Sequence, residues 1–411
     1  MLKRLGLLLI CLAMMVPLVP AHAQAGKTVY VPDNFPTIQD AVNNAVPGTT
    51  IVVRDGVYRE NIIVDEKRDL VIMSEHGPKN TIIYNSREEI EVNIIELKAC
   101  TNIALQGFTI ANDKYSVAHG IKSTSDNVII KSNVISGPGI NTAIILESCR
   151  GVTIENNTLK FVVHGIRMDR TSGVLVKDNL ILGMDFYGIR LRHNNFRVTI
   201  CGNIISSCLK DGIFIEDSYY VTIYLNSITG CQESGIRVSS PGNSIYLNNF
   251  VDNGQHVAIQ KANTTWNSQP LDYIYDGRKY HGCLGNFWDN YKGVDNNHDG
   301  VGDTPYTISE GQIDRYPLME LISAYQIMPS TTTSTTTSPP PTTTTTSPSK
   351  TITTTTTSYT SPSFTITSTH PTTTSTSPPA SFDTIWILVP IAILVALALA
   401  LLTMKRGRRK V

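Results

Sequence analysis

The sequence predicts an all-β fold, a right-handed parallel β-helix solenoid, from three observations. One asparagine recurs every 22 to 24 residues, and a glycine or alanine followed by isoleucine recurs with the same period. Short segments such as Val152–Glu155 alternate apolar and polar residues, and the repeats carry no helical stripe. A period of about 20 to 50 residues indicates a solenoid, and short strands alone indicate a β-helix. The asparagine column is Asn133, Asn157, Asn179, Asn203, Asn226 and Asn248, and the glycine column is Gly120, Ala143, Gly165, Gly188, Gly212 and Gly235.

These columns have a physical meaning in a stack of coils. Successive coils lie about 4.8 Å apart, so equivalent residues form vertical files. We expect Ile166, Ile189 and Ile213 to share one interior file. We expect each column asparagine to adopt the left-handed turn conformation and to hydrogen-bond to the coils above and below it. Glycine should permit the other corner. The repeated phrase is therefore mostly structural.

The β-helix domain is expected over residues 27–328, with a cap at each end. An open solenoid exposes strand edges unless its end coils are covered. At the N-terminus, residues 27–60 predict a short amphipathic helix that starts at Thr37 and covers the first coil. At the C-terminus, residues 283–320 leave the repeat and are expected to cap the last coil.

The two ends of the chain predict a membrane-anchored topology. Residues 1–23 have the basic, apolar and small-residue order of a signal peptide. Residues 385–404 are almost wholly apolar and long enough to span a bilayer, and the basic tail 405–411 follows at once. Between them, the Thr/Ser/Pro-rich residues 330–381 predict a disordered stalk, O-glycosylated or bare. We expect a single-pass cell-membrane protein with an extracellular N-terminal domain and a cytoplasmic C-terminus.

Composition limits the partners and the covalent chemistry. Lys plus Arg and Asp plus Glu both number 34, so no basic surface indicates nucleic acid as a partner. Asn156 and Asn263 begin Asn-x-Thr sequons and are candidate glycosylation sites. Cys208 and Cys231 each follow their column asparagine by five residues. They should therefore stack within reach of a disulfide, although two small buried residues fit the pattern equally well.

The sequence resembles a known family. Its period, its Asn and Gly columns and its Ile-Gln-Asp-Ala-Val helix resemble the pectin-lyase-like β-helix superfamily. The block GNFWDNYKGVDNNHDGVGDTPYTI, followed by DRYPLM, resembles NosD-like surface proteins common in archaea. That resemblance implies a link to copper-site assembly. Copper prefers clusters of His, Cys and Met, however, and His119 and His164 should lie two coils apart, so copper is not expected.

A run of oxygen-bearing side chains after the block's tryptophan predicts a structural calcium site. Its spacing matches the first part of a calcium loop, with Gly300 at the sixth position. It departs from an EF-hand at the twelfth position, where Tyr306 replaces glutamate, and no helices are expected to flank it. An Asx/Gly-rich turn without metal is the alternative. The expected ligands are Asp295, Asn297, Asp299, the Val301 carbonyl and Asp303.

The outer face of the strand after the glycine column is the candidate ligand surface. Its outward positions mix arginines with carboxylates, near Tyr187, Tyr219 and Tyr220. Arginine suits bidentate contacts to carboxylates, and aromatic rings pack on sugar faces. The surface could form a groove for an acidic polysaccharide, or a solvated charge ladder. The groove residues are Lys122, Arg167, Asp169, Arg190, Arg192, Glu216 and Arg237.

These observations favour a non-catalytic surface protein that binds glycans or other surface proteins along this flank. The alternative hypothesis is an enzyme, namely a surface lyase or glycoside hydrolase that acts on acidic polysaccharide. The resemblance implies that lyases of this fold pair calcium-binding aspartates with an arginine base, and that glycosidases use paired carboxylates. Asp169 with Arg190, or Glu147 with Asp169, are the nearest equivalents, and neither lies in a recognisable motif. A NosD-type role in copper processing is a third alternative.

Overall fold

The computed structural model describes residues 26–328, apart from residues 90, 114–116 and 261–262. The predicted signal peptide, stalk, membrane span and basic tail lie outside these residues. No helix within 26–328 is long and apolar enough to cross a membrane.

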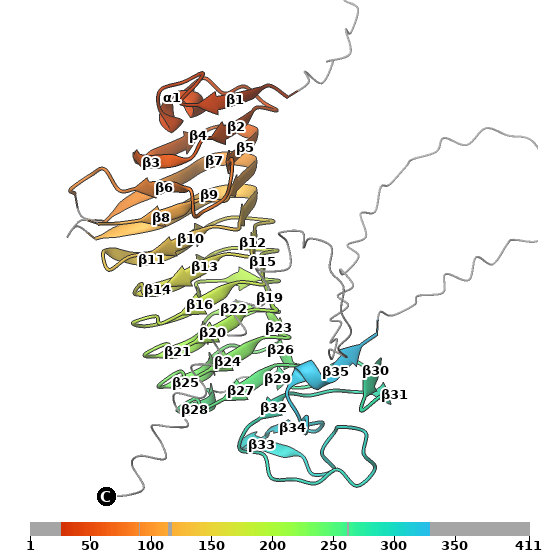
Figure 1. The fold of residues 1–411 in the computed structure, drawn as a ribbon. Helices are drawn as coiled ribbons and strands as arrows, with labels where there is room; N and C mark the ends of the chain where they lie inside the picture. The colour runs from red at the N-terminus through yellow and green to blue at the C-terminus, as the bar shows by residue number, and fades with distance from the viewer. Residues whose placement is uncertain (1–25, 90, 114–116, 261–262, 329–411) are drawn as a thin grey trace, which may run out of the picture. The chain divides into compact units, whose positions relative to one another are not determined.

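The described chain is a parallel β-helix whose coils stack along one axis (Figure 1). Each coil contributes strands to three faces, which we call A, B and C. Faces A and B form one continuous 18-stranded sheet, because β7 (Val92–Gln106) and β9 (Ala118–Lys131) run through the corner between them without a break. Face C is a separate ten-stranded sheet. All pairings within the three faces are parallel, as a right-handed solenoid requires.

The strands follow one order in almost every coil. Face A contains β4 (Ile62–Asp65), the first parts of β7 and β9, β11 (Ile140–Glu147), β14 (His164–Asp169), β17 (Ile189–Arg192), β21 (Asp211–Ile215), β25 (Ser234–Val238) and β28 (Gln255–Ile259). Face B contains β1 (Thr28–Val31), β2 (Thr50–Val53), β5 (Arg68–Ser74), the second parts of β7 and β9, β12 (Thr153–Glu155), β15 (Leu175–Lys177), β19 (Thr199–Cys201), β23 (Thr222–Tyr224), β26 (Asn243–Tyr246) and β29 (Thr264–Thr265). Face C contains β3 (Gly56–Arg59), β6 (Thr81–Tyr84), β8 (Thr109–Ala111), β10 (Val134–Ser136), β13 (Thr158–Lys160), β16 (Leu180–Leu182), β20 (Ile204–Ser206), β24 (Ser227–Thr229), β27 (Asn249–Val251) and β32 (Phe287–Trp288).

The predicted interior files are present. Ile166 pairs with Ile189, which pairs with Ile213, and all three side chains are fully buried. The alternation of apolar and polar residues in each strand places one side chain inward and the next outward. The core is therefore a set of apolar stacks, one for each inward position of the coil.

The asparagine column forms a buried ladder. Each Nδ2 donates to the Oδ1 of the next asparagine, over 2.9–3.1 Å, from Asn133 through Asn248 to Asn286. The expected left-handed conformation, however, belongs to the residue before each column asparagine, for example Asn156 and Leu225. The prediction was wrong on this point because the rung asparagine must hold its amide toward the next coil.

The reason why glycine occupies its column also differs from the expected one. Gly212 is not in the left-handed region; a Cβ at this position would lie 2.6 Å from the carbonyl oxygen of Gly235 in the next coil. Glycine is required here because two backbones approach closely, and not because a corner needs positive φ.

Both ends of the solenoid are covered. At the N-terminus, α1 (Ile38–Asn43) begins after Thr37, whose Oγ1 accepts from the Asp40 amide, and it buries Ile38, Ala41 and Val42. At the C-terminus two small antiparallel sheets and one turn of 3₁₀ helix follow. They are β30 (Leu271–Tyr275), β31 (Arg278–Gly282) and β35 (Tyr325–Ile327) in one antiparallel sheet, β33 (Tyr306–Ser309) with β34 (Gln312–Asp314), and η1 (Ile322–Ala324).

Asp314 joins this C-terminal region to the ladder. Its Oδ2 accepts from the Asn286 amide at 2.7 Å and from Trp288 Nε1 at 3.0 Å, so the last rung ends on a carboxylate. Trp288 is buried between Phe250 and Tyr306, with ring centroids 4.6 and 4.5 Å apart. The Trp-Asp-Asn-Tyr and Asp-Arg-Tyr-Pro-Leu segments therefore close the end of the solenoid.

Candidate functional site

The outer surface of face A has the register that the sequence predicts. Lys122, Arg167, Arg190, Phe214 and Arg237 occupy equivalent positions in successive coils, with Ile145 between the first two. Two residues further along the strand, Glu147, Asp169 and Arg192 form a second file. The pleat directs both files to the outside of the wall.

Most of these charges are paired. Lys122 Nζ lies 3.0 Å from Glu147 Oε2, and Arg192 Nε pairs with Glu216. Arg237 Nε lies 2.7 Å from Asp211 Oδ2, and its Nη2 also contacts Glu233.

Asp169 does not face solvent as expected for a groove residue. Its side chain is 4% exposed, and its two oxygens contact Arg167 Nε at 2.7 Å and His193 Nδ1 at 3.0 Å. It is an internal counter-ion that fixes Arg167, because a buried carboxylate must be paired. No face A carboxylate named above is left without a cation.

Arg190 is the exception among the face A arginines. It makes no ion pair with any described carboxylate, whereas Arg192 is paired with Glu216. The Nε atoms of Arg190 and Arg192 are both buried without a well-directed hydrogen bond. The guanidinium of Arg190 lies over the ring of Tyr187, with Cζ 5.4 Å from the centroid. Burial, followed by the charge of Arg192 and that of Arg167, lowers the pKa of Arg190. The site thus holds a partly desolvated cation that an anion would stabilise.

An aromatic stack borders Arg190. The rings of His164, Tyr187 and Phe214 stack in consecutive coils, with centroids 5.5 and 5.2 Å apart. Burial, aided by Arg190 and Arg167, lowers the pKa of His164 to about 4, so the imidazole is neutral at physiological pH. Phe186 packs against His164 with its ring tilted by 52°, and it is 40% exposed. We call His164, Arg167, Tyr187, Arg190 and Phe214 the arginine flank.

The sequence anticipated only part of this flank. His164 was considered only as a copper ligand, and its stacking on Tyr187 depends on a register that becomes visible once the glycine column is aligned. Tyr219 and Tyr220 lie elsewhere, at β22 (Ser218–Tyr219), which pairs with β18 (Asn195–Phe196) beyond the strand end. Tyr220 contacts Phe196 there.

Two hollows of about 240 Å³ each lie at the ends of the solenoid. One is beside α1 and is lined in part by Phe35 and Ala45, and the other is lined in part by His256 and Tyr306. The five side chains of the arginine flank are partly exposed on the outside of face A, so a ligand would lie along this wall.

The predicted calcium loop is folded as an Asx-turn loop. Asp295 Oδ2 accepts from the Gly300 amide at 2.8 Å, and Asp299 Oδ1 accepts from the Val301 amide at 2.8 Å. Asp303 Oδ2 accepts from the Asn296 amide at 2.9 Å, and Asn297 Oδ1 accepts from the Asp299 amide at 3.1 Å.

Tyrosine hydroxyls from the neighbouring sheet hold this loop in place. Tyr273 donates to the Asp299 carbonyl at 3.1 Å and Tyr280 to the His298 carbonyl at 2.7 Å. No α-helix flanks the loop. A turn of this shape presents carboxylate and carbonyl oxygens in the manner that Ca²⁺ prefers, and calcium binding stays a prediction.

The remaining predicted positions are accessible or buried as follows. Asn156 and Asn263 are both exposed, so each could carry a glycan. Cys208 and Cys231 are fully buried, stack in adjacent coils and are free thiols in the structure. A disulfide between them stays a prediction. His119 and His164 are separated by Thr142, which pairs with both, so they lie two coils apart as expected.

Comparison with known proteins identifies the family. The protein-family model described as "Periplasmic copper-binding protein (NosD)" matches residues 42–293 of the sequence. The chain belongs to the NosD family. The matched segment of this NosD-family chain contains the asparagine ladder to Asn286, the arginine flank and the first residues of the block around Trp288. No curated protein matches the chain.

Several solved structures show a distant similarity to this NosD-family chain. The A-module of mannuronan C-5 epimerase AlgE6 from Azotobacter vinelandii is 17% identical, over 55% of this chain and 73% of that one, with a TM-score of 0.42. An alginate lyase from a Paenibacillus species is 15% identical, over 58% and 87% of the two chains, with a TM-score of 0.41. Tailspike protein 2 of an Escherichia coli O157:H7 bacteriophage is 14% identical, over 59% and 42%, with a TM-score of 0.40. At these identities the likeness concerns the fold alone.

Proposed function

We propose that the protein is a membrane-anchored cell-surface β-helix that binds an acidic polysaccharide on the arginine flank without cleaving it. The single observation that carries this proposal is Arg190, the face A arginine with no carboxylate partner among the described residues. A polyuronate supplies repeated carboxylates along an extended chain, and a guanidinium binds a carboxylate through two parallel hydrogen bonds.

The rest of the flank supports this ligand class. The Tyr187 and Phe214 rings give an apolar platform beside the cation, which suits the flat face of a sugar ring. Arg167 is held by Asp169 and Glu147, so it adds positive potential from a fixed position. The predicted stalk and membrane helix would display this surface outside the cell.

The pairing of the carboxylates supports binding over hydrolysis. A glycosidase needs one carboxylic acid that can protonate the leaving group and a second that acts as base or nucleophile. On face A, Asp169, Glu147 and Glu216 are each engaged in an ion pair, so none of them is a free carboxyl group available for either role.

A β-eliminating lyase is the second candidate, and the His164–Tyr187 contact favours it. In such a reaction Arg190 would neutralise a uronate carboxylate, and neutral His164 would remove the proton next to it. The Tyr187 hydroxyl would then donate a proton to the departing sugar oxygen. His164 Nδ1 is buried without a hydrogen-bond partner, so Nε2 is the ring nitrogen that would act as the base.

One experiment separates the two candidates. The full-length protein is titrated with a polyuronate and with a neutral glucan, and the products are examined for unsaturated sugars. We expect salt-sensitive binding of the polyuronate alone, no unsaturated product, and at least a tenfold loss of affinity in Arg190→Gln.

The matched control is Lys122→Gln, which removes a cation from the same file that is already paired with Glu147. It should weaken binding far less. Equal binding by Arg190→Gln and the unaltered protein would refute the proposal, and unsaturated product would establish the lyase instead.

A further inference from the structure

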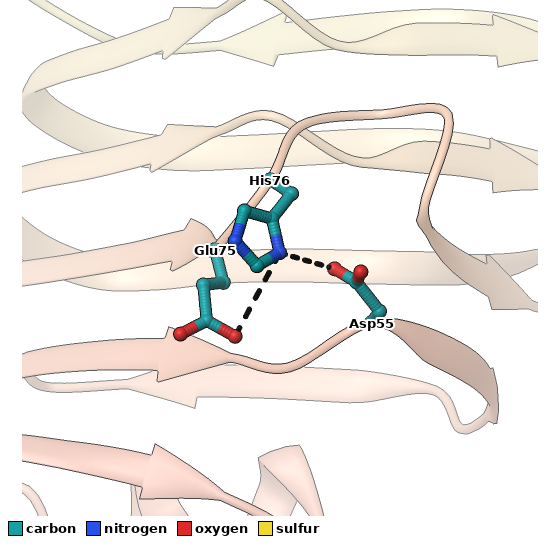
Figure 2. A group of neighbouring side chains, drawn as sticks. All are labelled: Asp55, Glu75 and His76. Atoms are coloured by element: carbon teal, nitrogen blue, oxygen red, sulfur yellow. Dashed lines mark hydrogen bonds and ion pairs between the residues drawn. The ribbon is translucent and has the colours of Figure 1, made fainter.

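A second group of ligand-type atoms lies far from the arginine flank, at a corner near the N-terminus (Figure 2). Asp55 Oδ1 lies 3.0 Å from His76 Nδ1, and Glu75 Oε2 lies 3.9 Å from the same nitrogen. All three ligand atoms lie within 4.8 Å of one another. In Figure 2 both carboxylates point toward one edge of the imidazole.

The backbone pairing of adjacent coils brings Asp55 and His76 together. Val53 at the end of β2 pairs with Ser74 at the end of β5, and the Glu75 amide donates to the Val53 carbonyl at 2.9 Å. Asp55 and His76 therefore follow the paired strand ends by the same number of residues and meet across adjacent coils. Ser74 Oγ accepts from the Gly77 amide at 2.9 Å, which holds the turn that carries His76.

Arg54 orients the second carboxylate. Its Nη1 pairs with Glu75 Oε1, while its Nη2 lies 2.7 Å from Asp33 Oδ2. Glu75 therefore turns its other oxygen, Oε2, toward His76. A hydrogen bond from the next shell is the usual way in which a protein fixes the direction of a metal-binding carboxylate.

The other His–Asp pairs of the described chain show what is unusual here. Each of the other three carboxylates receives a donor in addition to histidine. At Asp169 the second partner is Arg167, at Asp272 it is Lys279, and at Asp289 it is the Asp252 amide. Only at His76 does a second carboxylate face the imidazole, and no other group of three such ligand atoms occurs in the described residues.

We propose that Asp55, Glu75 and His76 bind a divalent first-row transition-metal ion through Oδ1, Oε2 and Nδ1. Two carboxylates balance the charge of the ion, and the imidazole favours such ions over Ca²⁺ and Mg²⁺. Ligands about 2.1 Å from a tetrahedral ion lie about 3.4 Å apart, and the observed 3.0 and 3.9 Å bracket this value.

The site would be open to an external ligand. The His76 and Asp55 side chains are 59% and 48% exposed, so an ion held by these three groups keeps a free position for water or another donor. Coordination through Nδ1 requires that this nitrogen carry no proton, so the imidazole would bind the ion as the tautomer with its proton on Nε2.

The test uses the full-length protein and Zn²⁺ in equilibrium dialysis, with the visible spectrum of Co²⁺ as a second readout. We expect one Zn²⁺ to bind even in excess Ca²⁺, and at least a tenfold loss of affinity in both His76→Ala and Asp55→Asn. The matched control is His281→Ala, since His281 is 67% exposed and pairs with Asp272, which also contacts Lys279. That variant should bind Zn²⁺ like the unaltered protein.

Thermal melting of each variant checks that the fold is retained, which the exposure of His76 favours. The proposal fails if the unaltered protein binds no Zn²⁺, or if binding survives in both His76→Ala and Asp55→Asn. It also fails if His281→Ala loses as much affinity as His76→Ala, because ordinary surface histidines would then account for the binding.

Discussion

The inside and the outside of the same wall are built on one register but differ in how their polar groups are paired. Inside, every rung of the asparagine ladder donates to the next one, from Asn133 to Asn286. Outside, on face A, cations are matched to carboxylates coil by coil until Arg190, which has none. The regular part of the pattern therefore serves stability, and the interruption of the pattern marks the candidate site.

Breaking the ladder is the largest expected effect on the inside. Asn203→Ala removes a side chain that donates to Asn226 and accepts from Asn179, which leaves several buried groups without partners. We expect a loss of about 3–5 kcal/mol in the free energy of unfolding, since each buried unsatisfied group costs about 1–3 kcal/mol. Denaturant unfolding measures it.

The exposed Asn263→Ala is the control for this variant and should change the free energy of unfolding by less than about 0.5 kcal/mol. A similar loss in both variants would mean that the ladder has no special energetic role.

The carboxylate at the end of the ladder predicts a pH dependence. Burial raises the pKa of Asp314 to about 6 from 3.8, so the folded chain binds a proton that the unfolded chain releases between these values. Stability from this group is complete below pH 4 and is lost as the pH rises through about 6, by about 3 kcal/mol in total.

The free energy of unfolding is measured between pH 3.5 and 7 for the unaltered protein and for Asp314→Asn. The difference between the two proteins should change over about 2–3 pH units. The exposed Asp276→Asn should keep the slope of the unaltered protein. A slope of opposite sign would show that the donors from Asn286, Trp288 and Tyr316 outweigh burial.

Calcium should change the stability of the fold through the outer loop. If the loop of Asp295 to Asp303 binds Ca²⁺ with the weak affinity of extracellular modules, 10 mM Ca²⁺ should stabilise the fold by about 1–3 kcal/mol. Thermal melting with and without Ca²⁺ measures this. Asp295→Asn, which removes the carboxylate that accepts from Gly300, should abolish the shift. An equal shift in both proteins would place the ion elsewhere.

The smallest expected effect distinguishes Arg190 from its neighbour. Arg190→Met removes an unpaired, partly buried cation and should leave the fold unchanged or about 0.5 kcal/mol more stable. Arg192→Met removes the partner of Glu216 and should cost up to about 1 kcal/mol. Chemical denaturation of both variants compares them. A larger loss at Arg190 would mean that this residue is structural.

The sequence predicted the files of the wall well, because a strict period forces equivalent residues into contact. Ile166, Ile189 and Ile213, and the outward arginines, lie where the period places them. The reasons for two columns were wrong, since a period shows which residues stack but not their backbone conformation. Leu225, before Asn226, takes the left-handed conformation. Gly212 is required because the backbone of the next coil lies too close for a Cβ atom.

The rest of the site could not be predicted for specific reasons. Asp55 and His76 lie in early coils that lack the repeated phrase, so no column aligns them across their 21-residue separation. The pairing of each arginine depends on side-chain geometry, which decided that Asp169 is buried under Arg167. The antiparallel sheet of β30, β31 and β35 has no periodicity to indicate it.

The ladder has a direction, and this sets how a solenoid of this kind can end. Each rung donates its backbone N–H and one Nδ2 proton to the next asparagine toward the C-terminus, so any further asparagine would need one more acceptor beyond it. Asp314 only accepts when ionised, and it therefore works as a terminator. Whole coils could be added or removed between Asn133 and Asn286 while Asp314 still accepts from the last asparagine. The length of the solenoid can therefore vary while its C-terminal end stays the same.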